Sequence, residues 1–386
     1  MSFSADTAPD TGSILSAVCH LDAEHGRLTY RGYDVNELAE HATFEQVAYL
    51  LVAGALPTPV ELKVFRRAWT AAQKLSAAER RWLRSVRLDA DELTVLRTVV
   101  SGLSLAGAAA APASDGLAGI SPEALRLLAR VPAFSAERQR LRRGGNPVPG
   151  WGRQGVAHGY LRVATGVEPP VELVRAFDAA LILRADNELN PGTYAARIAA
   201  STGADLTSCV TAAMGALAGP KHSGHTLAVA RLLAEVGATD RADGVVEKLA
   251  LAGKKPAGFG HPVYRGEDPR TPTARRLAEI ACGATGAMAT YDLARAVEAA
   301  VGSRTGLRAN VDYYLTVVYL AAGLPPAAFA ALFAVARTPG WIAHALEQSR
   351  DPDLIRPRAR YTGPEEQHLP PAAREDHGLR IPRRHR

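Results

Sequence analysis

The fold class of the chain is indicated most clearly by one stretch, Thr43-Phe44-Glu45-Gln46-Val47-Ala48-Tyr49-Leu50-Leu51-Val52-Ala53-Gly54-Ala55-Leu56-Pro57-Thr58-Pro59-Val60-Glu61. It opens with a capping box, Thr43 followed by Gln46, and apolar residues then recur on one helical face. Gly54 and Pro57 end this helix, and a second cap at Thr58 opens another. The stretch therefore predicts two successive amphipathic helices.

Similar signals continue along the chain and predict an all-α protein. Ser121-Pro122-Glu123 repeats the capping pattern ahead of another apolar segment. Residues 101–119 are expected to form a helix followed by a loop, and residues 142–155 an exposed connection. Residues 28–34 are expected to be briefly extended, and the chain from Pro364 onward an extended or disordered arm.

The composition indicates a folded, soluble protein. The chain has 386 residues, of which 47% are hydrophobic and 22% charged, so we expect two domains or one large helical domain with a satellite. The formal net charge of +6 favours anionic ligands, although part of the excess lies in residues 380–386. The sequence has no basic stripe interleaved with aromatic residues, which argues against a nucleic-acid-binding protein.

The cysteines and the N-terminus favour a cytoplasmic location. Cys19, Cys209 and Cys282 are widely separated and support neither a disulfide framework nor a zinc cluster. The first residues lack the regions of a secretory signal, and no apolar run is long enough to span a membrane. The histidines form no short chelating pattern, so no metal is expected.

The main functional signal is a set of polar residues that interrupts the helical segments of the second half. In order, the set is Asp186-Asn187-Glu188, Gly219-Pro220-Lys221-His222, Gly258-Phe259-Gly260-His261, Asp268-Pro269-Arg270, Asn310-Val311-Asp312, Arg337 and Arg356-Pro357-Arg358. The set contains two histidines beside Gly or Pro breaks, a carboxylate and several arginines. Such a combination would suit proton transfer beside a small anionic substrate.

The first histidine of this set lies at a break between two apolar stretches. His222 is therefore expected near a helix N-terminus, where the helix dipole disfavours the imidazolium. A neutral imidazole can donate a hydrogen bond to a developing oxyanion. A loop histidine that caps backbone groups is an equally good interpretation of this motif alone.

The second histidine follows a loop bracketed by glycines. Lys254 and Lys255 precede Gly258-Phe259-Gly260-His261, and backbone donors with lysine ammonium groups would suit a nucleotide-like phosphate. An ordinary solvated loop is the alternative. Next along the chain, Arg270 could bind a substrate carboxylate or simply pair with Asp268.

Asp312 and Arg337 stand beside apolar segments that are expected to be buried. A carboxylate in apolar surroundings is a candidate general base, but Asp312 could instead cap a helix that begins near Tyr313. Arg337 follows an apolar helical face and needs a partner carboxylate, either from the protein or from a substrate.

Together these motifs resemble the citrate synthase family, including its methylcitrate-forming members, from about residue 28 to residue 363. The resemblance is carried by Tyr30-Arg31-Gly32-Tyr33, Gly54-Ala55-Leu56-Pro57-Thr58, Asn310-Val311-Asp312-Tyr313-Tyr314, Ala336-Arg337-Thr338-Pro339-Gly340-Trp341 and the His222, His261 and Arg270 motifs. It implies an almost all-helical homodimer. A large domain would comprise residues 1–223 and 324–386, and a small domain residues 224–323, with the active site in the cleft.

The resemblance also implies an acyltransferase that converts the acyl group into an alkyl group on transfer. An acyl-CoA such as acetyl-CoA would condense with a 2-oxo acid such as oxaloacetate in a Claisen-type reaction that releases CoA. His222 would hydrogen-bond the thioester oxygen, Asp312 would remove the neighbouring proton, and His261 would polarise the ketone and supply its proton. Acyl-CoA would be a cosubstrate, and no tightly bound cofactor is expected.

Binding residues follow from the same resemblance. Arg270 and Arg337 would clamp the carboxylates of the acceptor, and Arg356 would reach in from the other subunit. The loop Gly258-Phe259-Gly260 would seat the adenine end of CoA, with Lys255 as a phosphate-binding candidate.

One departure from the family pattern falls in the expected acceptor site. Asn187 stands where the family usually has a histidine, and asparagine is shorter and cannot carry charge. Pro191 adds a helix break or kink nearby. We therefore expect the same chemistry in a reshaped pocket. Cleavage of a citryl-CoA-like thioester is one alternative, and a catalytically silent paralogue that binds CoA esters is another.

Overall fold

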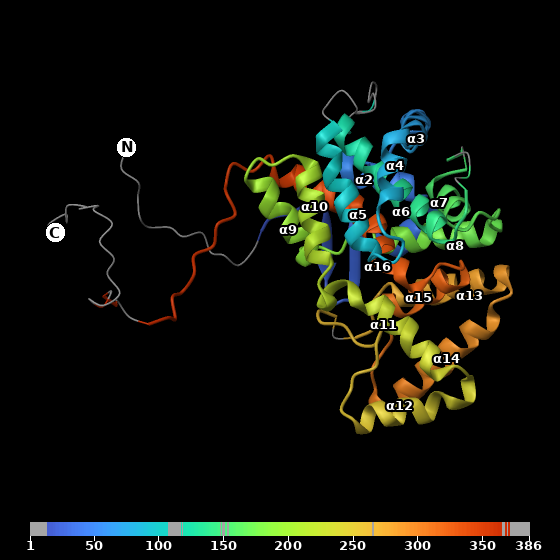
Figure 1. Ribbon diagram of the computed structural model, residues 1–386. Coiled ribbons are helices and arrows are strands. Elements are labelled where there is room, and N and C mark those ends of the chain that lie inside the picture. The colour runs from blue at the N-terminus through green and yellow to red at the C-terminus, as the bar shows by residue number, and fades with distance from the viewer. Residues whose placement is uncertain are drawn as a thin grey trace. The chain divides into compact units, whose positions relative to one another are not determined.

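The computed structural model describes residues 14–106, 117, 119–146, 148, 151–152, 154–264, 266–364, 367–368 and 370. The chain divides into two compact units, Ile14–Ile355 and a second unit that joins Met1–Ser13 to Arg356–Arg386. Every described helix and strand belongs to the first unit (Figure 1). Most of the arm expected after Pro364 lies outside the described residues, as do residues 107–116 of the expected loop.

A small antiparallel sheet precedes the helices. Strand β1 (Cys19–Asp22) pairs with β2 (Arg27–Tyr30), with Cys19 opposite Tyr30, and β2 pairs with β3 (Tyr33–Asp34). The extended segment expected at residues 28–34 is thus confirmed, whereas β1 was not expected. The sheet is a minor element of a helical protein.

Three helices of the first half begin directly after the predicted caps Thr43, Thr58 and Ser121. The helices of this half are α1 (Val35–His41), α2 (Phe44–Ala53), α3 (Pro59–Ala72), α4 (Ala77–Ser85), α5 (Glu92–Ser101), the 3-10 helix η1 (Gly102–Ala106), α6 (Pro122–Arg142), α7 (Val156–Thr165), α8 (Val171–Ile182), α9 (Pro191–Ser201) and α10 (Leu206–Leu217). Thr43 and Thr58 each form a complete capping box. Ser121 caps α6, but Glu123 does not reach back to it. Glu123 instead accepts hydrogen bonds from the Thr207 backbone and hydroxyl, at 3.0 and 2.8 Å.

The second half is also helical, which confirms the all-α class. It contains α11 (Pro220–Val236), the 3-10 helix η3 (Thr239–Arg241), α12 (Ala242–Leu251), α13 (Thr271–Thr285), α14 (Met288–Thr305), α15 (Val311–Ala321), the 3-10 helix η4 (Pro326–Ala328) and α16 (Phe329–Gln348). Helix α13 packs on α8 and α15, and α12 packs on α14 (Figure 1). Within the described residues, none of the helices is long and apolar enough to cross a membrane.

Helix α16 organises the core of the first unit. It packs against α2, α6, α9 and α10, and nearly all its residues are buried. Gly340 lies against the loop after α8: a Cβ atom there would lie 2.1 Å from Asp186 Oδ2 and 2.4 Å from the Ala185 carbonyl oxygen. Only glycine therefore allows α16 and this loop to approach so closely. Because the loop carries Asn187, this contact helps to shape the candidate site.

Candidate active site

One cavity of about 660 Å³ collects the polar motifs of the second half. Its lining includes every site residue expected from the sequence except one, namely Asn187, His222, Lys255, Gly258, Phe259, Gly260, His261, Arg270, Asp312 and Arg337. The exception, Arg356, is exposed and begins the second unit. Its expected role in a partner's site stays a prediction.

His222 lies in the first turn of α11, after the N-cap Gly219 and Pro220. The alternative of a loop histidine is therefore wrong. Burial, and then the Arg337 guanidinium, lower the pKa of His222 to about 4, so the ring is neutral near pH 7. The neutral state was expected from the helix dipole, but burial is its main cause. The buried Nε2 has no hydrogen-bond partner among the described residues.

His261 is held as a hydrogen-bond donor by the backbone beside it. Its Nδ1 accepts hydrogen bonds from the backbone N–H groups of Val263 and Tyr264, both at 3.1 Å. Burial, together with the Arg270 guanidinium, lowers the pKa of His261, so the ring is neutral. An imidazole that accepts at Nδ1 carries its proton on Nε2. His261 can therefore donate that proton to a ligand in the cavity.

The glycine loop before His261 is fixed by its neighbours rather than simply solvated. The Gly260 N–H donates to the Arg308 carbonyl at 2.7 Å, and the Asn310 N–H donates to the Gly258 carbonyl at 2.9 Å. The Phe259 ring is buried against Tyr313, with 4.7 Å between ring centroids. Gly258 has a φ of +84°, and a Cβ there would lie 2.6 Å from Val229 Cγ2. The solvated-loop interpretation is therefore wrong.

Asp312 occupies the first turn of α15 and is not the cap of that helix. The N-cap is Asn310, whose Oδ1 accepts from the Asp312 N–H at 3.1 Å and whose Nδ2 donates to the Gly260 carbonyl at 2.9 Å. The capping interpretation of Asp312 is therefore wrong. Its carboxylate is also not in purely apolar surroundings, because Arg184 Nη2 donates to Asp312 Oδ1.

Arg184 also lines the cavity, although the sequence motifs did not single it out. It follows α8 at the end of an apolar run, Leu181-Ile182-Leu183, and its side chain is 1% exposed. The available signal was a charged residue inside an apolar segment, because a buried arginine needs a partner. The partner, Asp312, lies 128 residues further along the chain.

Arg270 forms the ion pair with Asp268 that the sequence suggested as the simpler interpretation. Its Nε and Nη2 donate to the two carboxylate oxygens of Asp268 at 2.9 and 2.8 Å, and Nη1 donates to the Leu183 carbonyl at 3.4 Å. Burial alone would raise the pKa of Asp268, but Arg270 outweighs it and lowers that pKa. Asp268 also accepts from the Val311 N–H at 3.1 Å, which ties Arg270 to the start of α15.

Arg337 is buried in α16 next to Arg184. Its Nε donates to the Arg184 carbonyl at 2.6 Å, and its Nη1 has no hydrogen-bond partner in the described part of the chain. Both guanidiniums lie over the Phe333 ring, with Cζ 4.5 Å from the ring centroid for Arg184 and 5.0 Å for Arg337. Burial lowers the pKa of Arg337. The two cations thus form one positively charged wall of the cavity.

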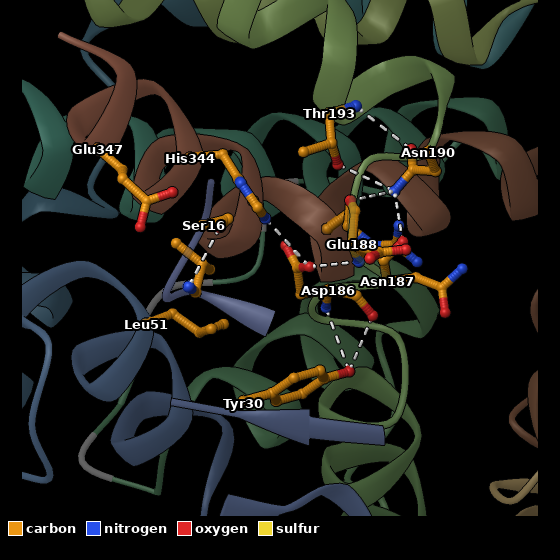
Figure 2. Close-up of polar contacts among 12 residues, drawn as sticks. Ser16, Tyr30, Leu51, Asp186, Asn187, Glu188, Asn190, Thr193, His344 and Glu347 are labelled. Carbon is orange, nitrogen blue, oxygen red and sulfur yellow. Dashed lines mark hydrogen bonds and ion pairs between the residues drawn. The ribbon is translucent and has the colours of Figure 1, made fainter. Parts of the chain in front are cut away.

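Asp186 anchors the loop that carries Asn187, as Figure 2 shows. Its backbone N–H and carbonyl both bond the Tyr30 hydroxyl, at 3.2 and 3.0 Å, and its Oδ1 accepts from the Glu188 N–H at 2.9 Å. His344 Nε2 lies 3.3 Å from the same oxygen, and His344 Nδ1 lies 3.1 Å from Arg197 Nη1. A guanidinium can only donate, so Nδ1 accepts and Nε2 is the donor to Asp186.

The loop that Asp186 anchors places Asn187 at the cavity. Its Oδ1 is buried without a hydrogen-bond partner among the residues described. Glu188, the next residue, has a φ of +53°, an uncommon conformation for a residue with a side chain. Pro191 does not kink a helix here, because it is the first residue of α9 and Asn190 is the cap.

Comparison with known proteins gives a consistent set of similarities. A family model described as "Citrate synthase, C-terminal domain" matches residues 8–358. The chain is 38% identical over 352 residues to a citrate synthase of Haloferax volcanii, covering 90% of this chain and 93% of that protein. It is 34% identical over 355 residues to a 2-methylcitrate synthase of Mycobacterium tuberculosis, covering 92% and 89%.

Solved structures give the same result. The crystal structure of a citrate synthase from Thermotoga maritima matches with a TM-score of 0.80 and 32% identity, covering 94% of this chain and 97% of that one. The ternary complex of carboxymethyl coenzyme A and oxaloacetate with citrate synthase from Thermoplasma acidophilum matches with a TM-score of 0.82 and 29% identity, covering 95% and 98%.

Proposed function

The chain belongs to the citrate synthase family, and from that premise we propose that it condenses an acyl-CoA with oxaloacetate or a related 2-oxo dicarboxylic acid and releases CoA. One observation carries the proposal: a single cavity brings together two neutral histidines, a carboxylate and three buried guanidiniums. The reaction needs this combination, since it moves a weakly acidic proton beside a dianionic acceptor.

The first step is removal of a proton from the carbon next to the thioester. Asp312 takes that proton, and neutral His222 donates a hydrogen bond to the thioester oxygen as negative charge develops there. A thioester α-proton is too weakly acidic for a carboxylate acting alone, so both groups must act together. The product of this step is an enolate, whose oxygen accepts the hydrogen bond from His222 and which is held between α11 and α15.

The second step joins the two carbon skeletons. The enolate carbon attacks the ketone carbon of the acceptor, and the Nε2–H of His261 donates to the ketone oxygen and supplies its proton. Water then hydrolyses the new thioester and releases CoA and the tricarboxylic acid. The enzyme is thus an acyltransferase whose acyl group becomes an alkyl group on transfer.

Substrate binding is assigned to the charged parts of the cavity. Arg270 and Arg337 bind acceptor carboxylates together with Arg356 of the other subunit in a homodimer, and Asn187 contacts the acceptor in place of the histidine usual in the family. The glycine loop and Lys255 bind CoA. Closure of a small domain, residues 224–323, onto the rest excludes water before the enolate forms.

The test is a free-thiol release assay with purified protein, acetyl-CoA and oxaloacetate, run beside propionyl-CoA and other 2-oxo acids. We expect rapid release with at least one pair, and a loss of about 10²- to 10⁴-fold in kcat for Asp312→Asn, because a general base contributes that range. If CoA is released only with a substrate pair other than acetyl-CoA and oxaloacetate, the result would indicate a reshaped acceptor site.

Two outcomes would contradict the proposal. If no substrate pair gives CoA release although CoA esters bind measurably, the result would support a noncatalytic paralogue. Product analysis that finds only cleavage of a citryl-CoA-like thioester would support a lyase.

A further inference from the structure

The Arg184 guanidinium has more hydrogen-bonding capacity than the protein uses. It is almost fully buried beside the cavity, and Nη2 donates to Asp312. Its Nε and Nη1 are buried with no hydrogen-bond partner among the described residues. Buried N–H groups of a cation that stay unpaired are costly, so this end of the side chain is suited to an anion.

The three guanidiniums of the cavity differ in what they still offer to a ligand. The fork of Arg270, formed by Nε and Nη2, is occupied by both oxygens of Asp268. Among the described residues, Arg337 bonds to protein through Nε and Arg184 through Nη2, and Arg337 Nη1 and Arg184 Nε and Nη1 are buried without a partner there. The unsatisfied donors therefore lie on the two arginines that share Phe333, rather than on Arg270.

Arg184 and Arg337 are also joined to each other. The Arg337 Nε–H donates to the Arg184 carbonyl at 2.6 Å, and both guanidiniums lie over the Phe333 ring. Two adjacent buried cations repel each other, and the pKa of Arg337 is lowered by burial and then by the charges of Arg270 and Arg184. A carboxylate bound between them would relieve that repulsion and satisfy the remaining donors.

We propose that Arg184 is a specificity-determining residue that binds an acceptor carboxylate together with Arg337, while its Nη2 holds Asp312. The inference rests on the proposed function, since it identifies the ligand as the anionic acceptor of that reaction. One guanidinium then contacts both the acceptor and the base. An acceptor without the carboxylate would leave the Arg184 donors unpaired, and the site would reject it.

The test separates direct binding from an effect through Asp312. The dissociation constant of oxaloacetate is measured by titration calorimetry, without acyl-CoA, for Arg184→Gln in the natural sequence and in an Asp312→Asn background. We expect about 10- to 100-fold weaker oxaloacetate binding in both backgrounds, in the range of a lost charge-assisted contact. The affinity for acetyl-CoA should change by less than about threefold, since the loss is confined to the acceptor subsite.

A matched control is Arg138→Gln. Arg138 is 2% exposed and paired with Glu92, but it does not line the cavity. The substitution Arg138→Gln should lower the melting temperature of the protein and leave its affinity for oxaloacetate unchanged. If Arg184→Gln does not fold, Arg184→Lys is used for the same comparison, because it keeps the charge but loses the planar fork.

The proposal is overturned if Arg184→Gln weakens oxaloacetate binding only when Asp312 is intact, because Arg184 would then act through the base alone. It is also overturned if binding is unchanged in both backgrounds. These results are independent of turnover: a wild-type protein that binds oxaloacetate through Arg184 but releases no CoA would refute the proposed function and leave this inference standing.

Discussion

Replacement of Gly340 by alanine would force apart two elements that build the acceptor side of the cavity. The added Cβ would lie 2.4 Å from the Ala185 carbonyl oxygen and 2.1 Å from Asp186 Oδ2, whereas real Cβ atoms essentially never come within 3.0 Å of such neighbours. A backbone oxygen cannot swing aside, so α16 or the loop must move by several tenths of an ångström. Overpacking costs about 1–3 kcal/mol and alanine gains about 1 kcal/mol in a helix, so we expect a net loss of up to roughly 2 kcal/mol.

The same movement should impair binding as well as stability. Gly340 lies three residues after Arg337 on α16, and the displaced loop continues into Asn187. We expect kcat/KM for oxaloacetate to fall by about tenfold or more, because small misplacements of positioning residues have effects of this order.

Thermal melting and steady-state kinetics of Gly340→Ala test this reasoning, with Gly283→Ala as the control. Gly283 lies in α13 and has no heavy atom of the described residues within 4 Å of an added Cβ, so its replacement should be neutral or slightly stabilising. The reasoning is refuted if Gly340→Ala melts at or above the temperature of Gly283→Ala with unchanged kinetic constants. That result would mean that α16 and the loop do not need their close approach.

Three further predictions concern single side chains of the cavity. Burial lowers the pKa of His222 from 6.5 to about 4, so the imidazole of the unfolded chain binds a proton at a higher pH than that of the folded protein. The free energy of unfolding should therefore decline as the pH falls from about 6.5 towards 4. Urea unfolding at several pH values should show a shallower decline for His222→Gln, and an unchanged slope would contradict the assignment. Lys255→Ala should raise KM for acyl-CoA about 3- to 10-fold and leave KM for oxaloacetate unchanged, because an exposed phosphate contact is lost and salt also weakens such a contact. Equal effects on the KM values of both substrates would argue against a CoA site at Lys255. Asn187→His should lower KM for oxaloacetate several-fold, since histidine can carry a charge towards the acceptor, and a higher KM would show that the pocket is adapted to asparagine.

Local sequence signals predicted the helices well because capping is a short-range interaction. Thr43 and Thr58 bond to residues three positions away, so these two caps form from neighbours along the chain. Other first-turn N–H groups find distant partners, as the Phe44 N–H does with Asp178.

Glu123 shows the limit of this reasoning. It lies two positions after the cap Ser121, one short of the position from which a side chain reaches back to the cap, and it bonds to Thr207, which is close only in the folded chain.

The candidate site was predictable as a set of residue types and not as an arrangement. The sequence located His222 at a helix start and suggested the pairing of Arg270 with Asp268, because both depend on residues within a few positions. It left open whether Asp312 is a base or the cap of α15, since Asn310 and Asp312 are both suitable capping residues, and only the backbone geometry chooses between them.

By itself the sequence determined the all-α class, the starts of the capped helices α2, α3 and α6 and the motifs that resemble citrate synthases, because these depend on periodicity and on neighbours along the chain. Tertiary structure decided which polar groups meet: Arg184 with Asp312 across 128 residues, and Asp186 with His344 across 158. Such pairs form because a buried charge must find a partner, and the packing of α8, α15 and α16 determines which partner is within reach.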